Sequence, residues 1–432
     1  MTQTVSAGAG VAAPKRILHV PRRFVAEEWG GTETVVLEIS REQQRAGWQP
    51  EILTTDALSD KATETIGGIS VRRFGYFYPY LGLSAAEKFA LDKKGGSAVS
   101  AGLFTALMRA KDVRLFHLHT MARLGGQVRT AARLRKIPYV LSLHGGAFDT
   151  QASEMKTMAD PTRGRFEWGK ALGAVFGSRR VLGDADHVIC VGQAEFEVAA
   201  KKLSHDRISC LPNGVDPEKF QRGDGAGFRR KHNIAVGAFV VLCLSRIDAQ
   251  KNQLALVEAL ARLRVTRPDA VLVLIGPETM PDYAARVRAM AAEKNLTPAV
   301  RILPGLRTDD ADLVNAYHAC DVFALPSNHE PFGIVVLEAW SARRPVVVSR
   351  LGGLRTLVRE GETGLFFDPT AADAPDQLAG KLKVFAAQPL LRERCAEAGW
   401  KEVQMHYTWS AVNQKLEMIY AVAERHVKDK HD

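Results

Sequence analysis

Two series of short apolar segments, alternating with helical stretches, set the strongest limit on how this chain can fold. Six β-rich runs occur in the first half of the chain, and six more follow in the second half. Runs this uniformly apolar are typical of parallel strands that are covered on both faces. The alternation therefore predicts an α/β protein with two parallel-sheet domains. The runs lie at 17–20, 51–55, 115–119, 139–144, 187–192 and 208–214, and then at 239–247, 270–277, 300–305, 322–327, 345–350 and 364–369.

A turn-rich segment separates the two series. Leu211–Phe220 holds proline, asparagine, glycine and aspartate, and we place the domain boundary near Asp216. The last stretch of the chain predicts an amphipathic helix, because its apolar residues recur at helical spacing. The predicted units are a disordered tail at 1–15, a first domain at 16–215, a second domain at 216–405 and a final helix at 406–432.

The stretch Pro326–Trp340, PSNHEPFGIVVLEAW, places two carboxylates around a glycine turn that opens a helix. Pro331 fixes φ, and Gly333 lets the backbone approach a ligand without a Cβ in the way. The unpaired N–H groups and the dipole of a helix start favour phosphate or sugar oxygens. Glu330 before the helix and Glu338 in its second turn can both accept hydrogen bonds from hydroxyl groups. Hydroxyls and phosphates together indicate a nucleotide-sugar.

This stretch resembles the E-x7-E signature of the retaining glycosyltransferases of family 4, which have the GT-B fold. Two glutamates at that spacing are common in helices, but the surrounding P-S-x-x-E-P-F-G-x-x-x-L-E-A is specific. Other landmarks follow in the family's order from about Ile17 to about Tyr420. The resemblance implies two Rossmann-like domains that face a cleft, with the acceptor on the first domain and the donor on the second. It also implies that the final helix crosses back to pack on the first domain.

The resemblance assigns a role to each part of this stretch. Glu330 and the amides around Phe332 and Gly333 are expected to bind sugar hydroxyls. The amides of Ile334, Val335 and Leu337 are expected to meet phosphate, and Glu338 to bind the ribose hydroxyls.

Two segments of the first domain resemble further parts of the family's donor site. EEWGGTE, with Gly30 and Gly31 after the first strand, resembles the glycine loop whose amides meet the donor diphosphate; an ordinary βα turn is the alternative. LSLHGG places His144 at the tip of a strand, where the family has a histidine beside the transferred sugar. His117 and His119 match a strand of the family, and we interpret both as structural.

Two segments of the second domain complete the predicted donor site. LSRIDAQKNQ supplies Arg246 and Lys251, the pair with which the family neutralises the departing diphosphate. ILPGLRTDD, with Gly305 and Leu306, resembles the loop that meets the nucleobase. The predicted catalytic residues are therefore Glu330, His144, Arg246 and Lys251.

The resemblance implies a front-face mechanism. The acceptor hydroxyl attacks from the side on which the diphosphate leaves, a phosphate oxygen takes the proton, and the protein contributes positioning and electrostatics. We predict no metal and no cofactor, because no D-x-D stands in a loop expected to hold one across the diphosphate.

Composition bounds the partners and the compartment. A formal net charge of +10 fits anionic substrates or a solvated surface, and a peripheral contact with anionic membrane stays open. The cations are dispersed and no nucleic-acid-binding motif occurs, so we predict no nucleic acid. No apolar run is long enough to span a bilayer, and the start of the chain lacks the features of a secretion signal. We predict a cytoplasmic protein, at most peripheral at the inner membrane face, with five cysteines that are buried reduced thiols.

The predicted function is transfer of a hexosyl group from a nucleotide diphosphate sugar to an acceptor hydroxyl. A UDP-sugar is favoured as donor over GDP-mannose, and the acceptor is a glycan, a lipid-linked molecule or a small molecule. Only the aromatic stretch Phe74–Leu83 and the polar segment Asp149–Lys170 bear on the acceptor. The alternative is a catalytically inactive GT-B protein that binds nucleotide-sugars. A Rossmann-type oxidoreductase is disfavoured, because no G-x-G-x-x-G follows a strand.

Overall fold

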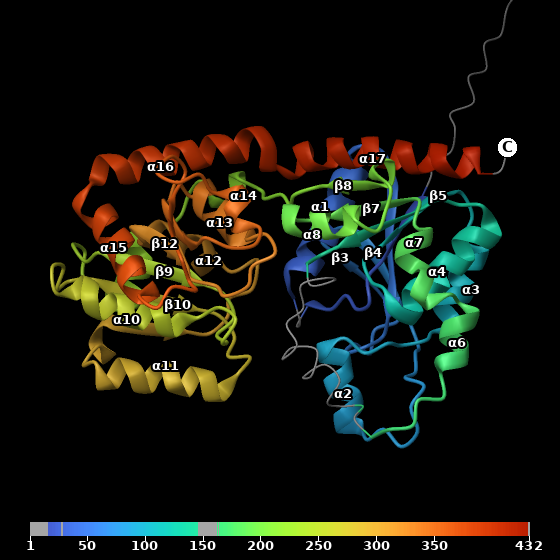
Figure 1. Ribbon diagram of the computed structural model, residues 1–432, viewed down its shortest axis with the longest axis horizontal. Coiled ribbons are helices and arrows are strands. Elements are labelled where there is room, and N and C mark those ends of the chain that lie inside the picture. Colours follow the sequence, from blue (N-terminus) through green and yellow to red (C-terminus); the bar gives the residue numbers. More distant parts are fainter. Residues whose placement is uncertain (1–15, 27–28, 146–161, 163, 431–432) are drawn as a thin grey trace, which may run out of the picture.

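Two parallel-stranded sheets organise the chain, as the two series of apolar runs predicted. The computed structural model describes residues 16–26, 29–145, 162 and 164–430. The predicted disordered tail at 1–15 and most of the segment 149–170 lie outside the described residues. The two sheets form separate bodies side by side, and one long helical segment runs along both of them (Figure 1).

The first sheet has eight strands in the order β3-β4-β2-β1-β5-β6-β7-β8. All neighbouring strands are parallel except β3 and β4, which form an antiparallel hairpin. The six apolar runs of the first series are all strands, but the sequence analysis missed this hairpin, whose turn is Gly67-Gly68. The strands are β1 (Arg16–Val20), β2 (Gln49–Thr55), β3 (Thr63–Ile66), β4 (Ile69–Phe74), β5 (Val113–Leu118), β6 (Tyr139–Leu143), β7 (His187–Cys190) and β8 (Ile208–Cys210).

Helices cover both faces of this sheet. Ile17 of β1 belongs to an apolar cluster with helix α1 and the end of the chain, whereas Leu18 belongs to a cluster with α3 and α4. Successive side chains of a strand point to opposite faces, so burial on both faces explains the uninterrupted apolar runs. The helices are α1 (Gly31–Arg45), α2 (Ala85–Lys94), α3 (Ala101–Arg109), α4 (Ala122–Arg135), α6 (Lys170–Val175), α7 (Val181–Asp184) and α8 (Gln193–Ala200).

The second sheet has six strands in the order β11-β10-β9-β12-β13-β14, and all of them are parallel. Every apolar run of the second series is one of these strands. The two faces again carry separate clusters, with Val240 in one and Val241 in the other. The strands are β9 (Val240–Leu244), β10 (Val271–Ile275), β11 (Val300–Leu303), β12 (Val322–Leu325), β13 (Val346–Ser349) and β14 (Leu365–Phe367).

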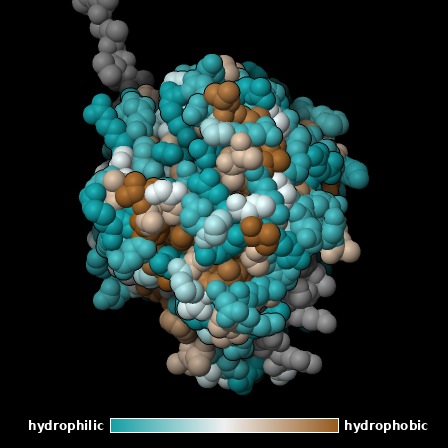
Figure 2. All heavy atoms as spheres, turned by 90° about the vertical axis from the view of Figure 1, so that its left-hand side faces the viewer, coloured by the Kyte–Doolittle hydropathy of each residue, from teal (hydrophilic) through white to brown (hydrophobic). Residues whose placement is uncertain are grey.

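The helices of the second half follow the strands in the order of a doubly wound sheet. They are α9 (Gly225–Lys231), α10 (Gln253–Arg264), α11 (Pro281–Glu293), α12 (Ala311–Ala319), α13 (Ile334–Ser341), α14 (Leu354–Leu357), α15 (Ala374–Ala387) and α16 (Pro389–Glu402). On the outer end of this half, hydrophobic atoms form small separate groups among hydrophilic ones (Figure 2). No helix among the described residues is long and apolar enough to cross a membrane.

The chain passes between the two sheets twice, and the two crossings lie side by side. A π-helical turn, Val403–Tyr407, joins α16 to the last helix, α17 (Trp409–Asp429). Val215 of the first crossing donates its backbone N–H to the carbonyl of Tyr407 in the second, at 2.8 Å. Gly214 lies so close to Trp409 that a Cβ there would be 2.7 Å from the indole ring. The two crossings are therefore paired at one place.

Helix α17 packs on the first sheet, as the family resemblance implied. Its buried face includes Val412, Leu416 and Tyr420, whereas Val422 is only partly buried. Arg114 at the start of β5 fixes the helix, because its guanidinium pairs with Glu417 at 2.7 Å and Glu424 at 2.8 Å. The predicted helix is thus part of the first domain's core, although it comes after the second domain in the chain.

The cysteines are free thiols, and four of the five are buried as predicted. Cys210, at the end of the short strand β8, is exposed, so the prediction of a buried thiol is wrong there. β8 is an edge strand of the first sheet, and burial falls along it from Ile208 to Cys210.

Replacing Leu416 by alanine should destabilise the protein by about 2–5 kcal/mol, because a fully buried leucine leaves a cavity between α17 and the first sheet. Met418 lies on the same helix and is 65% exposed, so Met418→Ala should change the free energy of unfolding by less than about 0.5 kcal/mol. Denaturant unfolding measures both variants. Equal stabilities of the two would contradict the packing of α17 described above.

Candidate active site

The turn before α13 has the conformation that the sequence predicted. Gly333 caps the helix with φ of +99°, in the left-handed region that favours glycine. A Cβ at this position would lie 2.7 Å from Leu354 Cδ2. The first N–H groups of α13 therefore follow a turn that only glycine fits without strain.

A second glycine turn holds the carbonyls that precede α13. Gly353 donates its N–H to the carbonyl of Glu330 at 3.0 Å. A Cβ on Gly352 would lie 2.3 Å from that same oxygen, and one on Gly353 would lie 2.1 Å from the carbonyl of Pro331. The backbone at Glu330 is thus fixed from the side of β13.

Lys251 and Glu330 form an ion pair at the centre of the predicted donor site. Lys251 Nζ lies 2.7 Å from Glu330 Oε2, and only 14% and 11% of the two side chains are exposed. The two residues are 79 positions apart in the chain. The structure thereby brings together one predicted diphosphate ligand and one predicted sugar ligand.

Asp248 organises the loop that carries both predicted cations, and the sequence analysis missed it. Its buried carboxylate accepts the backbone N–H of Lys251 at 3.1 Å and the hydroxyl of Thr279 at 3.1 Å. It also lies 3.4 Å from Arg246 Nη2, whose other partner is the side-chain carbonyl of Gln250 at 2.8 Å. Arg246 is half-exposed. That it reaches the same diphosphate as Lys251 stays a prediction.

Glu338 lies in the second turn of α13, beside a tyrosine that the sequence analysis did not single out. Tyr317 of α12 donates its hydroxyl hydrogen to Glu338 Oε2 at 2.7 Å. Burial raises the pKa of Glu338, while this hydrogen bond lowers it by a smaller amount. The second carboxylate oxygen has no hydrogen-bond partner among the described residues, so Glu338 can accept a further hydrogen bond from a hydroxyl group.

Three glycines of the first domain approach the start of α13. A Cβ on Gly145 would lie 2.3 Å from Pro331 Cβ, and one on Gly192 would lie 2.6 Å from the carbonyl of Pro331. The nearest atom to the Cβ position of Gly31 is Ile334 Cδ1, at 3.8 Å. Gly30, next to it, is the N-cap of α1. Gly31 of the predicted loop therefore stands opposite α13, whereas the Cβ position of Gly30 faces the carboxylate of Glu33 in its own helix.

A pocket of about 320 Å³ opens between the two domains at this contact. Its walls come from the segment at Gly145, from the start of α8, from Asn328–Pro331 and from the turn at Leu351–Gly353. Glu330 thus borders a cavity to which both domains contribute. The segment that follows Gly145, including Gly146 of the predicted motif, lies outside the described residues.

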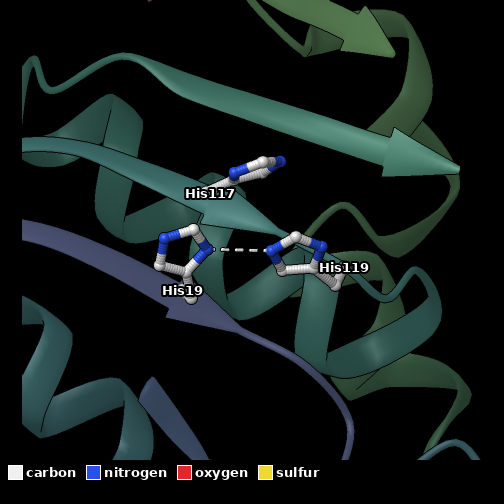
Figure 3. Close-up of side chains that lie close together, drawn as sticks. All are labelled: His19, His117 and His119. Carbon is white, nitrogen blue, oxygen red and sulfur yellow. Dashed lines mark hydrogen bonds between the residues drawn. The ribbon is translucent and has the colours of Figure 1, made fainter. Parts of the chain in front are cut away.

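His144 follows β6 and belongs to a chain of histidines. Its Nε2 lies 2.9 Å from His119 Nδ1, and His119 Nε2 lies 3.0 Å from His19 Nδ1. His117 lies beside them on β5, with its ring centroid 4.1 Å from that of His119 (Figure 3). Burial lowers the pKa of His144 and that of His19 to about 4, and those of His117 and His119 well below the ordinary value.

The predicted nucleobase loop follows β11. A Cβ on Gly305 would lie 2.8 Å from Pro277 Cδ, and Leu306 packs partly buried against the core that contains α13. The role of this loop stays a prediction.

Two D-x-D tripeptides occur in the chain. Asp184 pairs with Arg129 and Asp310 caps α12, so each begins with a structural residue.

Two family models match the two halves of this architecture. A model described as glycosyl transferase 4-like domain matches residues 30–214, and one described as glycosyl transferases group 1 matches residues 226–402. The D-inositol 3-phosphate glycosyltransferase of Kineococcus radiotolerans is 31% identical over 357 residues, which cover 78% of this chain and 76% of the relative. The chain belongs to the group 1 glycosyltransferases. This transferase is also 29% identical over 410 residues to the protein of the same name from Stackebrandtia nassauensis, with 91% of this chain and 87% of the relative covered.

Solved structures share the fold over almost the whole chain. Anabaena HepE in complex with UDP and glucose has a TM-score of 0.70 at 19% identity, with 94% of this chain and 99% of that chain covered. A glycosyltransferase from Rickettsia africae has a TM-score of 0.71 at 19% identity, with 95% and 99% covered. The predicted GT-B fold and the predicted family are therefore both confirmed.

Mild acid should destabilise the first domain. An unfolded histidine binds a proton near pH 6.5, whereas folded His19 and His144 do so only near pH 4. Between these values the unfolded state binds more protons, so the free energy of unfolding should fall as the pH decreases. Each such histidine contributes up to about 1.4 kcal/mol per pH unit.

Denaturant unfolding between pH 7 and pH 5 measures this slope. His187 of β7, whose pKa burial also lowers to about 4, offers a comparison, because Ser209 is the one hydrogen-bond partner of its ring among the described residues. His187→Gln should lose one histidine's share of the slope and keep the rest. A stability that is constant over this pH range would contradict the burial of the four histidines.

Proposed function

We propose that this transferase moves a hexosyl group from a UDP-sugar to a hydroxyl of a small phosphorylated acceptor of the inositol phosphate type, with retention of anomeric configuration and without a metal. The ion pair between Lys251 and Glu330 carries the proposal. It places a cation next to a carboxylate that borders the interdomain pocket and can accept hydrogen bonds from hydroxyl groups. A sugar diphosphate presents both an anion for the cation and hydroxyl groups for the carboxylate.

In this mechanism the protein would lower the barrier mainly by positioning the substrates and by stabilising charge. Lys251 and Arg246 would stabilise the negative charge that develops on the departing diphosphate, with the N–H groups at the start of α13 beside them. Glu330 would hold a sugar hydroxyl, and His144 would contact the sugar from the first domain. A phosphate oxygen would take the proton of the acceptor hydroxyl. These cations replace the charge that a divalent metal supplies in other transferases, which is why we propose a metal-independent reaction.

The donor is proposed on two grounds. HepE, which shares the fold, binds UDP and glucose in its solved structure. Glu338, with one carboxylate oxygen held by Tyr317, is suited to accept a ribose hydroxyl at the other. A ribose contact is the same for UDP and GDP, so the proposed preference for UDP rests on the fold neighbour alone.

The acceptor is proposed from the relatives and from charge. The curated relatives described above are named for D-inositol 3-phosphate. A net charge of +10 favours a phosphorylated acceptor over a neutral one.

An exposed aromatic patch favours a lipid-linked acceptor as the second candidate. Phe77 and Trp168 stack at 5.7 Å, and Phe89 of α2 and Phe166 are more than half exposed. The backbone of Leu81 bonds that of Phe166, and Arg165 pairs with Glu87 of α2, so these segments are linked. Lys93 and Arg165 border the patch, and α2 stands away from the body of the first domain (Figure 1). Aromatic side chains with cations beside them suit the surface of an anionic membrane.

A turnover assay with UDP-sugars tests the proposal. We expect UDP release that depends on an inositol phosphate, persists in excess EDTA and gives an α-linked product from an α-linked donor by NMR. Activity that requires a lipid-linked acceptor in anionic vesicles would instead support the second candidate. Loss of activity in EDTA with recovery in Mn²⁺ would refute the metal-independent reaction, and binding of UDP-sugars without any turnover would identify an inactive binding protein.

Lys251→Ala and Arg246→Ala should each lower kcat by about 100-fold or more at saturating donor, because each removes a charge that stabilises the leaving diphosphate. Arg288 offers a matched control: it is an exposed arginine of the second domain that pairs with Glu278. Arg288→Ala should leave kcat unchanged. Rates close to that of the unaltered protein for both Lys251→Ala and Arg246→Ala would remove the diphosphate assignment.

A further inference from the structure

A buried chain of hydrogen bonds ends at His144 and begins far from the donor site. Gln43 of α1 lies between two members of this chain. Its Oε1 is 2.8 Å from His19 Nε2, and its Nε2 donates to the hydroxyl of Tyr420 at 2.9 Å. From His19 the chain continues through His119 to His144 with the distances given above. Gln43, Tyr420 and His19 are completely buried, so water cannot replace any of these partners.

The orientation of the Gln43 amide decides where every proton of the chain lies. Its Nε2 faces Tyr420, so its Oε1 must accept a hydrogen from His19 Nε2. A neutral imidazole carries one hydrogen, which leaves His19 Nδ1 as an acceptor. His119 must then donate from Nε2 and accept at Nδ1, and His144 must donate from Nε2. The remaining nitrogen of His144, Nδ1, is left with a lone pair and has no partner among the described residues.

A branch through Tyr420 obeys the same rule. The tyrosine accepts from Gln43 and therefore donates to His117 Nδ1 at 2.7 Å. His117 then donates from Nε2 to the hydroxyl of Ser142 at 2.7 Å. All four histidines thus carry their hydrogen on Nε2, which is the more stable tautomer of free histidine. Rotating the side-chain amide of Gln43 by half a turn would exchange donor and acceptor in every hydrogen bond of the chain and its branch. All four histidines would then carry their hydrogen on Nδ1.

We propose that Gln43 and Tyr420 are positioning residues that fix the tautomer of His144, so that its Nδ1 accepts a hydrogen bond from a hydroxyl of the transferred sugar. The proposal rests on the proposed function in one respect, since that function places a sugar beside His144. Because Tyr420 belongs to α17, the last helix of the chain contributes to the site from the far side of the first sheet. The arrangement requires neutral histidines, and their burial keeps them neutral at physiological pH.

A metal ion held by His19, His117 and His119 is the competing interpretation of this cluster. One ring nitrogen of each lies within 4.8 Å of the others. Both nitrogens of each of these rings, however, already have hydrogen-bond partners in the chain or its branch. A metal would have to break several of these bonds and leave buried groups such as the Gln43 amide unpaired, which costs stability. The geometry therefore favours the hydrogen-bond chain.

Nitrogen-15 NMR of histidine-labelled protein tests the tautomer directly, with the His144 signals assigned by their loss in His144→Asn. In the unaltered protein we expect the hydrogen on Nε2 of His144. Gln43→Met removes the amide that sets the direction of the hydrogen bonds, and should give a mixture of tautomers at His144. It should also lower kcat by about tenfold, because one hydrogen bond to the substrate is lost. The NMR readout does not depend on turnover, so it distinguishes failure of this proposal from failure of the proposed function.

Two further variants complete the test. Ser40→Ala is the matched control, because Ser40 is buried on the same helix and bonds only the carbonyl of Val36; it should leave the tautomer and kcat unchanged. Tyr420→Phe keeps the ring and removes the hydroxyl, and should mix the His144 tautomers as Gln43→Met does, which carries the test if Gln43→Met does not fold. A hydrogen on Nδ1 of His144 in the unaltered protein would overturn the proposal. So would an unaltered tautomer in Gln43→Met or Tyr420→Phe, or stoichiometric zinc in the purified protein that is lost in His19→Asn.

Discussion

The close approach of two backbone turns is the constraint on which the predicted donor site of this transferase depends. Gly352 and Gly353 lie against the carbonyls of Glu330 and Pro331, with no room for a Cβ on either glycine. This contact fixes the segment before α13, so Gly333 can turn the chain into the helix and Glu330 can face Lys251. It also presses Pro331 against Gly145 and the carbonyl of Pro331 against Gly192 of the first domain. One arrangement of glycines therefore sets the helix start, the ion pair and the contact between the domains.

The same two domains are joined a second time by the paired crossings of the chain. The backbone bond from Val215 to Tyr407 ties the link between the sheets to the start of α17. Any opening of the interdomain pocket must bend both crossings at this point, while α17 stays packed on the first sheet through Arg114 and Leu416. Tyr420 therefore stays with the first domain, although it lies near the C-terminal end of the chain. The proposed link from Tyr420 to His144 would consequently persist whether the pocket is open or closed.

The sequence predicted what depends on local pattern and missed what depends on distant partners. Apolar runs such as Val271–Ile275 are buried on both faces, so their composition alone identified every central strand. The hairpin of β3 and β4 escaped because neither strand is a continuous apolar run. Thr63–Ile66, at the sheet edge, alternates between exposed and partly buried residues, and Ile69–Phe74 alternates between buried and more exposed ones. Gly333 and Glu330 could be found because a helix start leaves a local signature.

Other members of the site leave no such signature. Asp248 was visible in the motif that supplied Arg246 and Lys251, but its burial and its contact with the hydroxyl of Thr279 come from another part of the chain, which no local pattern records. Tyr317 and Gln43 are even harder to identify from the sequence. Each looks like an ordinary helical residue, and each acquires a partner from another helix only when the chain folds.

The ion pair of Lys251 and Glu330 also limits how single substitutions at this site can be interpreted. Two largely buried charges that neutralise each other form one unit, and removing either leaves the other uncompensated. The lost rate in a Lys251 variant therefore contains a contribution from a displaced Glu330, and the converse holds for a Glu330 variant. Arg246 shares Asp248 with the same loop, so its removal would move Lys251 as well. The effects of these residues on catalysis should accordingly be non-additive. Double-mutant cycles among Arg246, Lys251 and Glu330 are needed to separate the proposed stabilisation of the diphosphate from the proposed positioning of the sugar.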